Sequence, residues 1–149
     1  MRNNTIKLEF RSLAENVALA RLVVASLASQ MNFTLSDIEE LKVVVSEAVS
    51  NSIIHGYDGQ PSGMILLEAA SEGDVLELRV TDSGKGIADI QKAMEPAYST
   101  DPERMGLGFV FMQSFMDELR VESQPGEGTC VILSKKPDSK DNLHNTSSN

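Results

Sequence analysis

The sequence has few of the features that mark secreted, membrane-bound or nucleic-acid-binding proteins. Its 149 residues include one cysteine, Cys130, which excludes an internal disulfide and is typical of a reducing compartment. The first ten residues, MRNNTIKLEF, lack the apolar core of a signal peptide. The longest apolar stretch, around VALARLVVASLA, is interrupted by Arg21 and is too short to span a bilayer. We therefore expect a soluble, cytoplasmic protein.

Basic residues are also scarce. Lysine and arginine total 13 against 22 acidic residues, which gives a formal net charge of −9, and no basic cluster occurs along the chain. A surface that binds nucleic acid or an anionic membrane needs concentrated positive charge. We therefore expect neither a nucleic acid nor a membrane as a direct partner.

The hydrophobic pattern predicts a single α/β domain over residues 1–135, followed by a polar, disordered tail over 136–149. Alternating and helical patterns follow one another in the order strand, two helices, two strands, glycine-rich loops around helices, and a final hairpin. This order predicts a two-layer α/β sandwich with a mixed, mostly antiparallel sheet and the helices on one face. The expected strands cover residues 5–10, 64–70, 75–81, 119–123 and 129–134, and the expected helices cover about 12–31, 36–56, 88–94 and 109–116.

Helix ends are predicted from local signals. Ser12 with Glu15, and Ser36 with Glu39, have the spacing of a capping box and are expected to begin the first two helices. Gly56 is expected to end the second helix in a left-handed conformation.

The second helix contains VVVSEAVSNSIIHGY, in which Glu47 is the only formal charge. An acid in such apolar surroundings loses hydration, which costs free energy, so a compensating structural or functional role is expected. Glu47, Asn51 and His55 follow at intervals of four and share one helical face. A carboxamide oxygen can bind a hard cation while the carboxylate accepts a proton. A structural role is an equal alternative for Glu47 and Asn51, and for His55, in the last turn, it is the better one.

Two glycine pairs and a threonine complete the candidate residues. TDSGKGI places Asp82 at a strand end beside Gly84 and Gly86, where a carboxylate can accept from an exocyclic amine. RMGLGF places Gly106 and Gly108 before a helix, where free amide groups can bind phosphate. In GEGTCVIL, a threonine that opens the last strand, Thr129, can face a ligand. Each motif alone is also compatible with an ordinary turn or strand.

Taken together and in this order, the motifs resemble the N, G1 and G2 boxes of the GHKL ATP-binding superfamily, whose fold is the Bergerat α/β sandwich. The stretches LEF, AR with VAS, and VVSEAVSNSIIHGY narrow the resemblance to the anti-sigma F factors of endospore-forming bacteria, which are small serine kinases. The resemblance covers residues 8–133.

The resemblance implies a role for each candidate residue. Glu47 corresponds to the general base and Asn51 to the Mg²⁺ ligand of an ATP or ADP site. Asp82 corresponds to the adenine contact, and the remaining cofactor-binding positions are Gly84, Gly86, Arg104, Gly106, Gly108 and Thr129. Residues 96–105 correspond to the nucleotide lid, in which Arg104 is the only basic residue.

The implied function is that of an ATP-dependent protein serine kinase and anti-sigma factor in sporulation. Such a protein binds and inhibits a sigma F-like factor, phosphorylates a serine of an anti-anti-sigma protein, and forms a homodimer. Arg21, a single charge in an apolar helix, is the first candidate for a partner contact, and an arginine at the edge of the core is the equal alternative. A general stress-response anti-sigma kinase, or a nucleotide-gated sigma-binding module without significant transfer, remains an alternative function.

Overall fold

The computed structural model describes residues 2–95 and 105–138. The elements are, in chain order, β1 (Asn4–Arg11), α1 (Asn16–Ser29), α2 (Leu35–Asn51), a π-helical turn η1 (Ser52–Gly56), β2 (Met64–Glu72), β3 (Val75–Asp82), α3 (Ile90–Met94), α4 (Met105–Phe115), β4 (Glu118–Gln124) and β5 (Gly128–Lys135).

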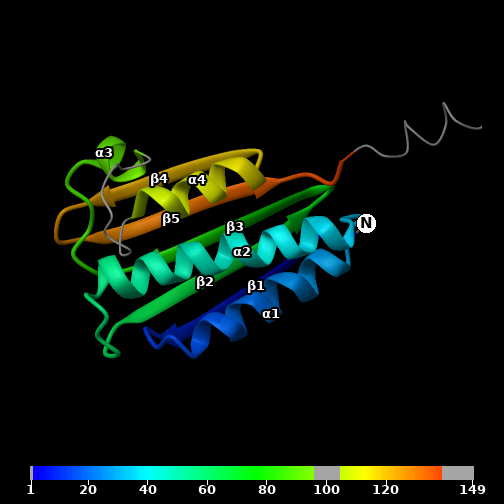
Figure 1. The fold of residues 1–149 in the computed structure, drawn as a ribbon. Helices are drawn as coiled ribbons and strands as arrows, with labels where there is room; N and C mark the ends of the chain where they lie inside the picture. The colour runs from blue at the N-terminus through cyan, green and yellow to red at the C-terminus, as the bar shows by residue number, and fades with distance from the viewer. Residues whose placement is uncertain (1, 96–104, 139–149) are drawn as a thin grey trace, which may run out of the picture.

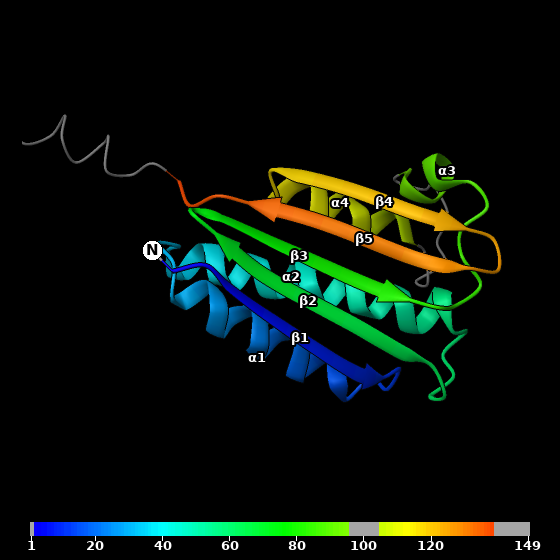
Figure 2. The ribbon, with the colours of Figure 1, turned by 180° about the vertical axis from the view of Figure 1, so that it is seen from behind.

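The strands form one sheet in the order β1-β2-β3-β5-β4, and all four strand pairings in the described ranges are antiparallel. Helices α1, α2 and α4 lie side by side on one face of this sheet, whereas the opposite face is uncovered (Figures 1 and 2). The predicted two-layer α/β sandwich is therefore confirmed. No parallel pairing occurs among the described strands, so the sheet is more uniform than expected.

The core lies between the sheet and the helices because every second residue of the central strands faces the helical layer. Ile65, Leu67 and Ala69 on β2 are fully buried, and β3 contributes alternate residues in the same way. The helices pack against this face with apolar residues at helical spacing. Their fully buried members are Ala20, Val24, Leu27 and Ala28 on α1, Leu41, Val44, Val45, Ala48 and Val49 on α2, and Phe109 and Met112 on α4.

The uncovered face of the sheet carries pairs of oppositely charged side chains. Lys7 on β1 pairs with Glu68 on β2 across a register position, at 3.7 Å. On β3, the Arg79 guanidinium lies 2.8 Å from Glu77. Exposed pairs of this kind add little stability, but they keep the sheet surface hydrated.

The expected capping boxes are both wrong, although both helices exist. The N-cap of α2 is Thr34, two residues before the predicted Ser36: the Thr34 hydroxyl accepts from the Asp37 amide at 3.1 Å, and the Asp37 carboxylate accepts from the Thr34 amide at 3.0 Å. Helix α1 has no side-chain cap at its N-cap residue, Glu15. The Ser12 hydroxyl instead accepts from the Gly63 amide at 3.1 Å and donates to the Gln60 carbonyl. The Ser12 hydroxyl, which the local pattern assigned to a helix cap, is thus used in tertiary hydrogen bonds instead.

Two further helix ends differ from expectation. Gly56 does not end α2 in a left-handed conformation, because the helix widens into the π-helical turn, and the positive φ angles fall at Asp58 (53°) and Gly59 (74°). Helix α4 begins at Met105, so Gly106 and Gly108 lie in its first turn and not in a preceding loop. Most of the predicted tail lies outside the described residues, so its boundary stays a prediction. No helix in the described part of the chain is long and apolar enough to cross a membrane.

Candidate functional site

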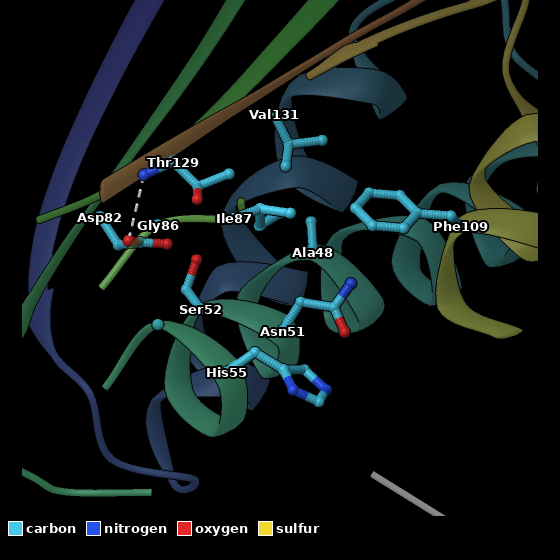
Figure 3. A pocket seen from close by; sticks show the side chains of 11 residues that line it. Ala48, Asn51, Ser52, His55, Asp82, Gly86, Ile87, Phe109, Thr129 and Val131 are labelled. Carbon is cyan, nitrogen blue, oxygen red and sulfur yellow. Dashed lines mark hydrogen bonds between the residues drawn. The ribbon is translucent and has the colours of Figure 1, made fainter. Parts of the chain in front are cut away.

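A pocket opens between the C-terminal end of α2, the loop after β3, the start of α4 and the start of β5 (Figure 3). It is lined by Ala48, Asn51, Ser52, His55, Gly56, Asp82, Gly86, Ile87, Phe109, Thr129 and Val131. The three sequence motifs are far apart in the chain, and the fold brings them to this one cavity. Asn51, Asp82, Gly86 and Thr129 were all predicted as site residues.

The π-helical turn η1 and the last residue of α2 contribute four residues to the pocket. The Tyr57 amide donates to the Ser52 carbonyl at 3.0 Å, five residues back, which is the hydrogen bond that defines such a turn. Turns of this kind concentrate at functional sites because they re-aim side chains. Here Asn51, Ser52, His55 and Gly56 all line the cavity. His55, for which a structural role was preferred, therefore borders the site.

Asp82 is a buried carboxylate whose surroundings already supply partners to one oxygen. The residue is 5% exposed, and its Oδ1 accepts from the Gly84 amide at 3.0 Å and from the Thr129 amide at 3.3 Å. These two amides compensate much of the desolvation of the charge. Figure 3 shows the second oxygen of Asp82 directed into the pocket. The carboxylate is thus held as an acceptor for a ligand group that donates hydrogen bonds.

The loop after β3 is fixed from two sides. The Lys85 amide donates to the Gly56 carbonyl at 3.0 Å, and the Gly126 amide donates to the Lys85 carbonyl at 2.7 Å. Gly86 has a φ of 75° and packs against the Gln124 carbonyl, so a side chain there would meet both strain and a steric clash. The loop therefore forms a rigid wall of the pocket.

Apolar residues form the remaining walls, and sequence reasoning missed them. Ala48, Ile87, Phe109 and Val131 point toward one another around the cavity in Figure 3. A flat aromatic ligand would lose water against such walls while Asp82 accepts a hydrogen bond from its edge.

Ser52 was missed by sequence reasoning as well. It is 4% exposed, and its hydroxyl points toward Asp82 and Thr129. Its position beside Asn51 was the only signal in the sequence.

Glu47 and Asn51 lie where the first turn of α4 meets α2. A Cβ built on Gly108 would stand 2.9 Å from Glu47 Oε2, 3.4 Å from Asn51 Nδ2 and 3.6 Å from Asn51 Oδ1. Both side chains therefore border the same small space in front of the Gly108 backbone. Partial burial raises the pKa of the Glu47 carboxyl above its ordinary value of 4.5. A carboxylate with a raised pKa is a better proton acceptor than a fully solvated one.

The site fits a magnesium ion held mainly by phosphates. The Asn51 amide nitrogen is buried and has no hydrogen-bond partner within the described residues. A half-turn of the carboxamide about its Cβ–Cγ bond would place an oxygen, which a hard cation prefers, at this position. No cluster of three or more His, Cys, Asp or Glu side chains suited to a metal occurs in residues 2–95 and 105–138. Mg²⁺ typically takes only one or two protein ligands, so a single amide is sufficient.

The other predicted residues fall into three groups. Gly106 and Gly108 belong to the first turn of α4, whose first four amides have no partner inside a helix and remain suited to phosphate. Arg21 is exposed on α1, away from the pocket. Arg104 and most of the predicted lid lie outside the described residues.

Comparisons with known proteins identify the family of this chain. Residues 10–135 match the histidine kinase-like ATPase domain. The chain is 48% identical to the anti-sigma F factor of Thermoanaerobacter pseudethanolicus over 134 residues, which cover 89% of this chain and 93% of that protein. It is 46% identical to the anti-sigma F factor of Clostridium acetobutylicum, covering 91% of this chain and 96% of the relative. The chain therefore belongs to the histidine kinase-like ATPase domain family, and within it to the anti-sigma F factors.

Solved structures support the same fold. The RsbU and RsbW domains of Rv1364c from Mycobacterium tuberculosis superpose with a TM-score of 0.64 at 21% identity, covering 89% of this chain and 32% of that one. A blue-light activated histidine kinase from Erythrobacter litoralis gives a TM-score of 0.53 at 23% identity, covering 75% and 34%. At these identities the likeness establishes the fold alone.

Proposed function

We propose that this protein is an anti-sigma factor and serine kinase. In this proposal it binds a sigma F-like factor and transfers the γ-phosphoryl group of ATP to a serine of an anti-anti-sigma protein. Family membership and a pocket suited to an adenine nucleotide support the nucleotide-binding part. One observation supports the transfer part: the Glu47 carboxylate, with a raised pKa, borders the same space as Asn51 at the first turn of α4.

The site's residues have distinct parts in this reaction. Asp82 accepts from the amino group of adenine, and the free amides at the start of α4 hold phosphate oxygens. The Asn51 carboxamide oxygen would hold Mg²⁺ together with the phosphates, and the ion would neutralise charge on the transferring group. Glu47 takes the proton from the serine hydroxyl as that oxygen forms its bond to phosphorus. The bond from phosphorus to the β–γ bridging oxygen breaks, and ADP leaves.

A nucleotide-gated binding module is the principal alternative. Such a module needs Asp82 and the apolar walls, but it has no use for a partly buried acid beside the phosphate end of the pocket. Burial of that acid costs free energy, and a proton-transfer role accounts for it.

The test is incubation of the protein with ATP, Mg²⁺ and candidate anti-anti-sigma proteins, followed by intact mass measurement. We expect the partner to gain the mass of one phosphoryl group, and a partner whose acceptor serine is replaced by alanine to gain none. Sigma binding that depends on ATP, without mass gain in any candidate, would favour the binding module.

The partner surface is also part of the proposal. Arg21 is exposed on α1, and its neighbour Leu22 is 66% exposed, so this face offers a charge and apolar area together. Arg21→Ala is expected to weaken sigma binding without affecting ATP affinity, whereas Lys7→Ala on the uncovered sheet face serves as the control. We also propose that the protein forms a homodimer, which light scattering would measure, and that it acts in the cytoplasm.

A further inference from the structure

Ser123 lies on β4, outside the pocket lining, but its hydroxyl contacts three groups that build the pocket. The hydroxyl accepts from the Ile87 amide at 2.8 Å and donates to the Gly128 carbonyl at 2.9 Å. It also lies 2.8 Å from the Thr129 hydroxyl, in a contact that either oxygen could donate. Ser123 therefore joins the loop after β3 to the start of β5.

The direction of the contact between Ser123 and Thr129 follows from counting protons. A serine hydroxyl has one proton and two acceptor sites. The Gly128 carbonyl can only accept, so the Ser123 proton must go to it if both short contacts are to be hydrogen bonds. The Ile87 amide occupies one acceptor site of Ser123. Thr129 must then donate its own proton into the second, and all three capacities of Ser123 are used.

This arrangement fixes what Thr129 can offer to a ligand. Its only hydroxyl proton is engaged by Ser123, so Thr129 presents lone pairs to the pocket, into which its oxygen points (Figure 3). The free oxygen of Asp82 is also an acceptor. Two neighbouring acceptors favour a ring edge that donates and disfavour one that accepts.

We propose that Ser123 is a positioning residue for base specificity, which sets the Thr129 hydroxyl as an acceptor and so strengthens selection of a 6-amino purine over a 6-oxo purine. This inference rests on the proposed adenine-nucleotide function. It adds a residue that never touches the nucleotide and acts through the orientation of one proton.

The test compares binding of ATP and ITP, which differ at positions 6 and 1 of the base, by titration calorimetry with Mg²⁺. In Ser123→Ala the Thr129 hydroxyl is free to rotate and can donate to the 6-oxo group. We expect the affinity ratio of ATP to ITP to fall about threefold to tenfold, the range of one hydrogen bond. Ser123→Thr retains a hydroxyl on a strand and should keep the wild-type ratio. Ser123→Cys, close in size but a weak hydrogen-bonding group, replaces the alanine variant if that variant does not fold.

A double-mutant cycle separates positioning from general damage. In a Thr129→Val background there is no hydroxyl to orient, so Ser123→Ala should leave the ratio unchanged. Equal loss of ATP and ITP affinity in Ser123→Ala would overturn the proposal, because a merely structural role predicts that result. A fall in the ratio that persists in the Thr129→Val background would overturn it as well. If the wild-type protein binds neither nucleotide, the proposed adenine-nucleotide function is itself contradicted. That result differs from binding of both nucleotides with an ATP-to-ITP ratio that Ser123→Ala leaves unchanged, which contradicts only the role of Ser123.

Discussion

The backbone of Gly108 packs directly against the carboxylate of Glu47, so that a Cβ at this glycine would stand 2.9 Å from Oε2. The contact joins α4 to α2 at the end of the site that is proposed to hold the phosphates. The conformation of the proposed base therefore depends on the absence of a side chain at Gly108 on the neighbouring helix.

Gly108→Ala tests this relationship. The atom that would be displaced is the end of a flexible side chain, and alanine is favoured over glycine in a helix by about 1 kcal/mol. We therefore expect unfolding stability to be unchanged or higher, while phosphoryl transfer falls at least about tenfold because Glu47 is moved from its position. Thermal denaturation and single-turnover transfer measure the two effects. Ser114→Ala, near the end of the same helix, is the control. Undiminished transfer in Gly108→Ala would show that the position of Glu47 is not critical.

Glu47→Gln separates chemistry from binding. The change keeps the side-chain shape and removes the proton acceptor, and loss of a general base typically lowers the rate by about 10²–10⁴. The lower end is expected because phosphoryl-transfer transition states are loose. ATP affinity and ATP-dependent sigma binding should persist. If transfer continues at the wild-type rate, Glu47 is a structural acid.

The same substitution makes a prediction about stability and pH. Burial raises the pKa of Glu47, so the folded protein binds this proton more tightly than the unfolded chain does. The resulting stabilisation is present below the ordinary pKa of 4.5 and is lost as the pH rises through the folded-state value. The melting temperature of Glu47→Gln should therefore rise relative to that of the wild type as the pH increases from acid to neutral. A melting-temperature difference between Glu47→Gln and wild type that stays constant over this pH range would contradict the prediction.

Asn51→Ala should abolish magnesium-dependent nucleotide binding or transfer and leave the fold intact. Asn51 has no hydrogen bond from its buried amide nitrogen within the described residues, so its removal breaks no stabilising contact of that atom. Nucleotide titration with and without Mg²⁺ measures the effect, and circular dichroism checks the fold. A variant that phosphorylates its partner normally would exclude Asn51 as the metal ligand.

Asp82→Asn should reduce discrimination between ATP and GTP. The asparagine oxygen can keep the amides of Gly84 and Thr129, while its NH₂ group replaces the free acceptor with a donor. A buried acceptor left unpaired costs about 1–3 kcal/mol, so wild type should prefer ATP by tenfold or more. Competitive titration of both nucleotides gives the ratio. Equal affinities in the wild-type protein would contradict the role of Asp82.

Thr34→Ala tests the cap of the helix that carries Glu47. Loss of an N-cap side chain costs about 1 kcal/mol, and here it removes the acceptor of the Asp37 amide, while the Thr34 backbone amide can still donate to the Asp37 carboxylate. Ser36→Ala, at the position that the sequence pattern favoured, is expected to change stability by less than half as much. Denaturant unfolding of both variants measures the difference. A larger effect at Ser36 would reverse the assignment of the cap.

The sequence by itself determined the periodic features of this protein. Alternation along the strands gave the buried faces of β2 and β3, because a strand's side-chain period is a property of its own backbone. The four-residue spacing of Glu47 and Asn51 likewise put both on one side of α2. Asp82 could be placed at a strand end because the strand pattern stops there.

The tertiary structure decided what depends on partners far along the chain. Ser12 could not be recognised as a bridge to Gln60 and Gly63, because the local pattern favoured a cap and the competing groups lie about fifty residues away. The π-helical turn that aims Ser52 into the pocket has no periodic signature. The contact of Ser123 with Thr129 lies within one hairpin, but its contact with the Ile87 amide, 36 residues away, depends on the packing of the loop after β3 against β4. Hydrogen-bond partners across such distances are selected by the packing of the whole fold, which no local pattern contains.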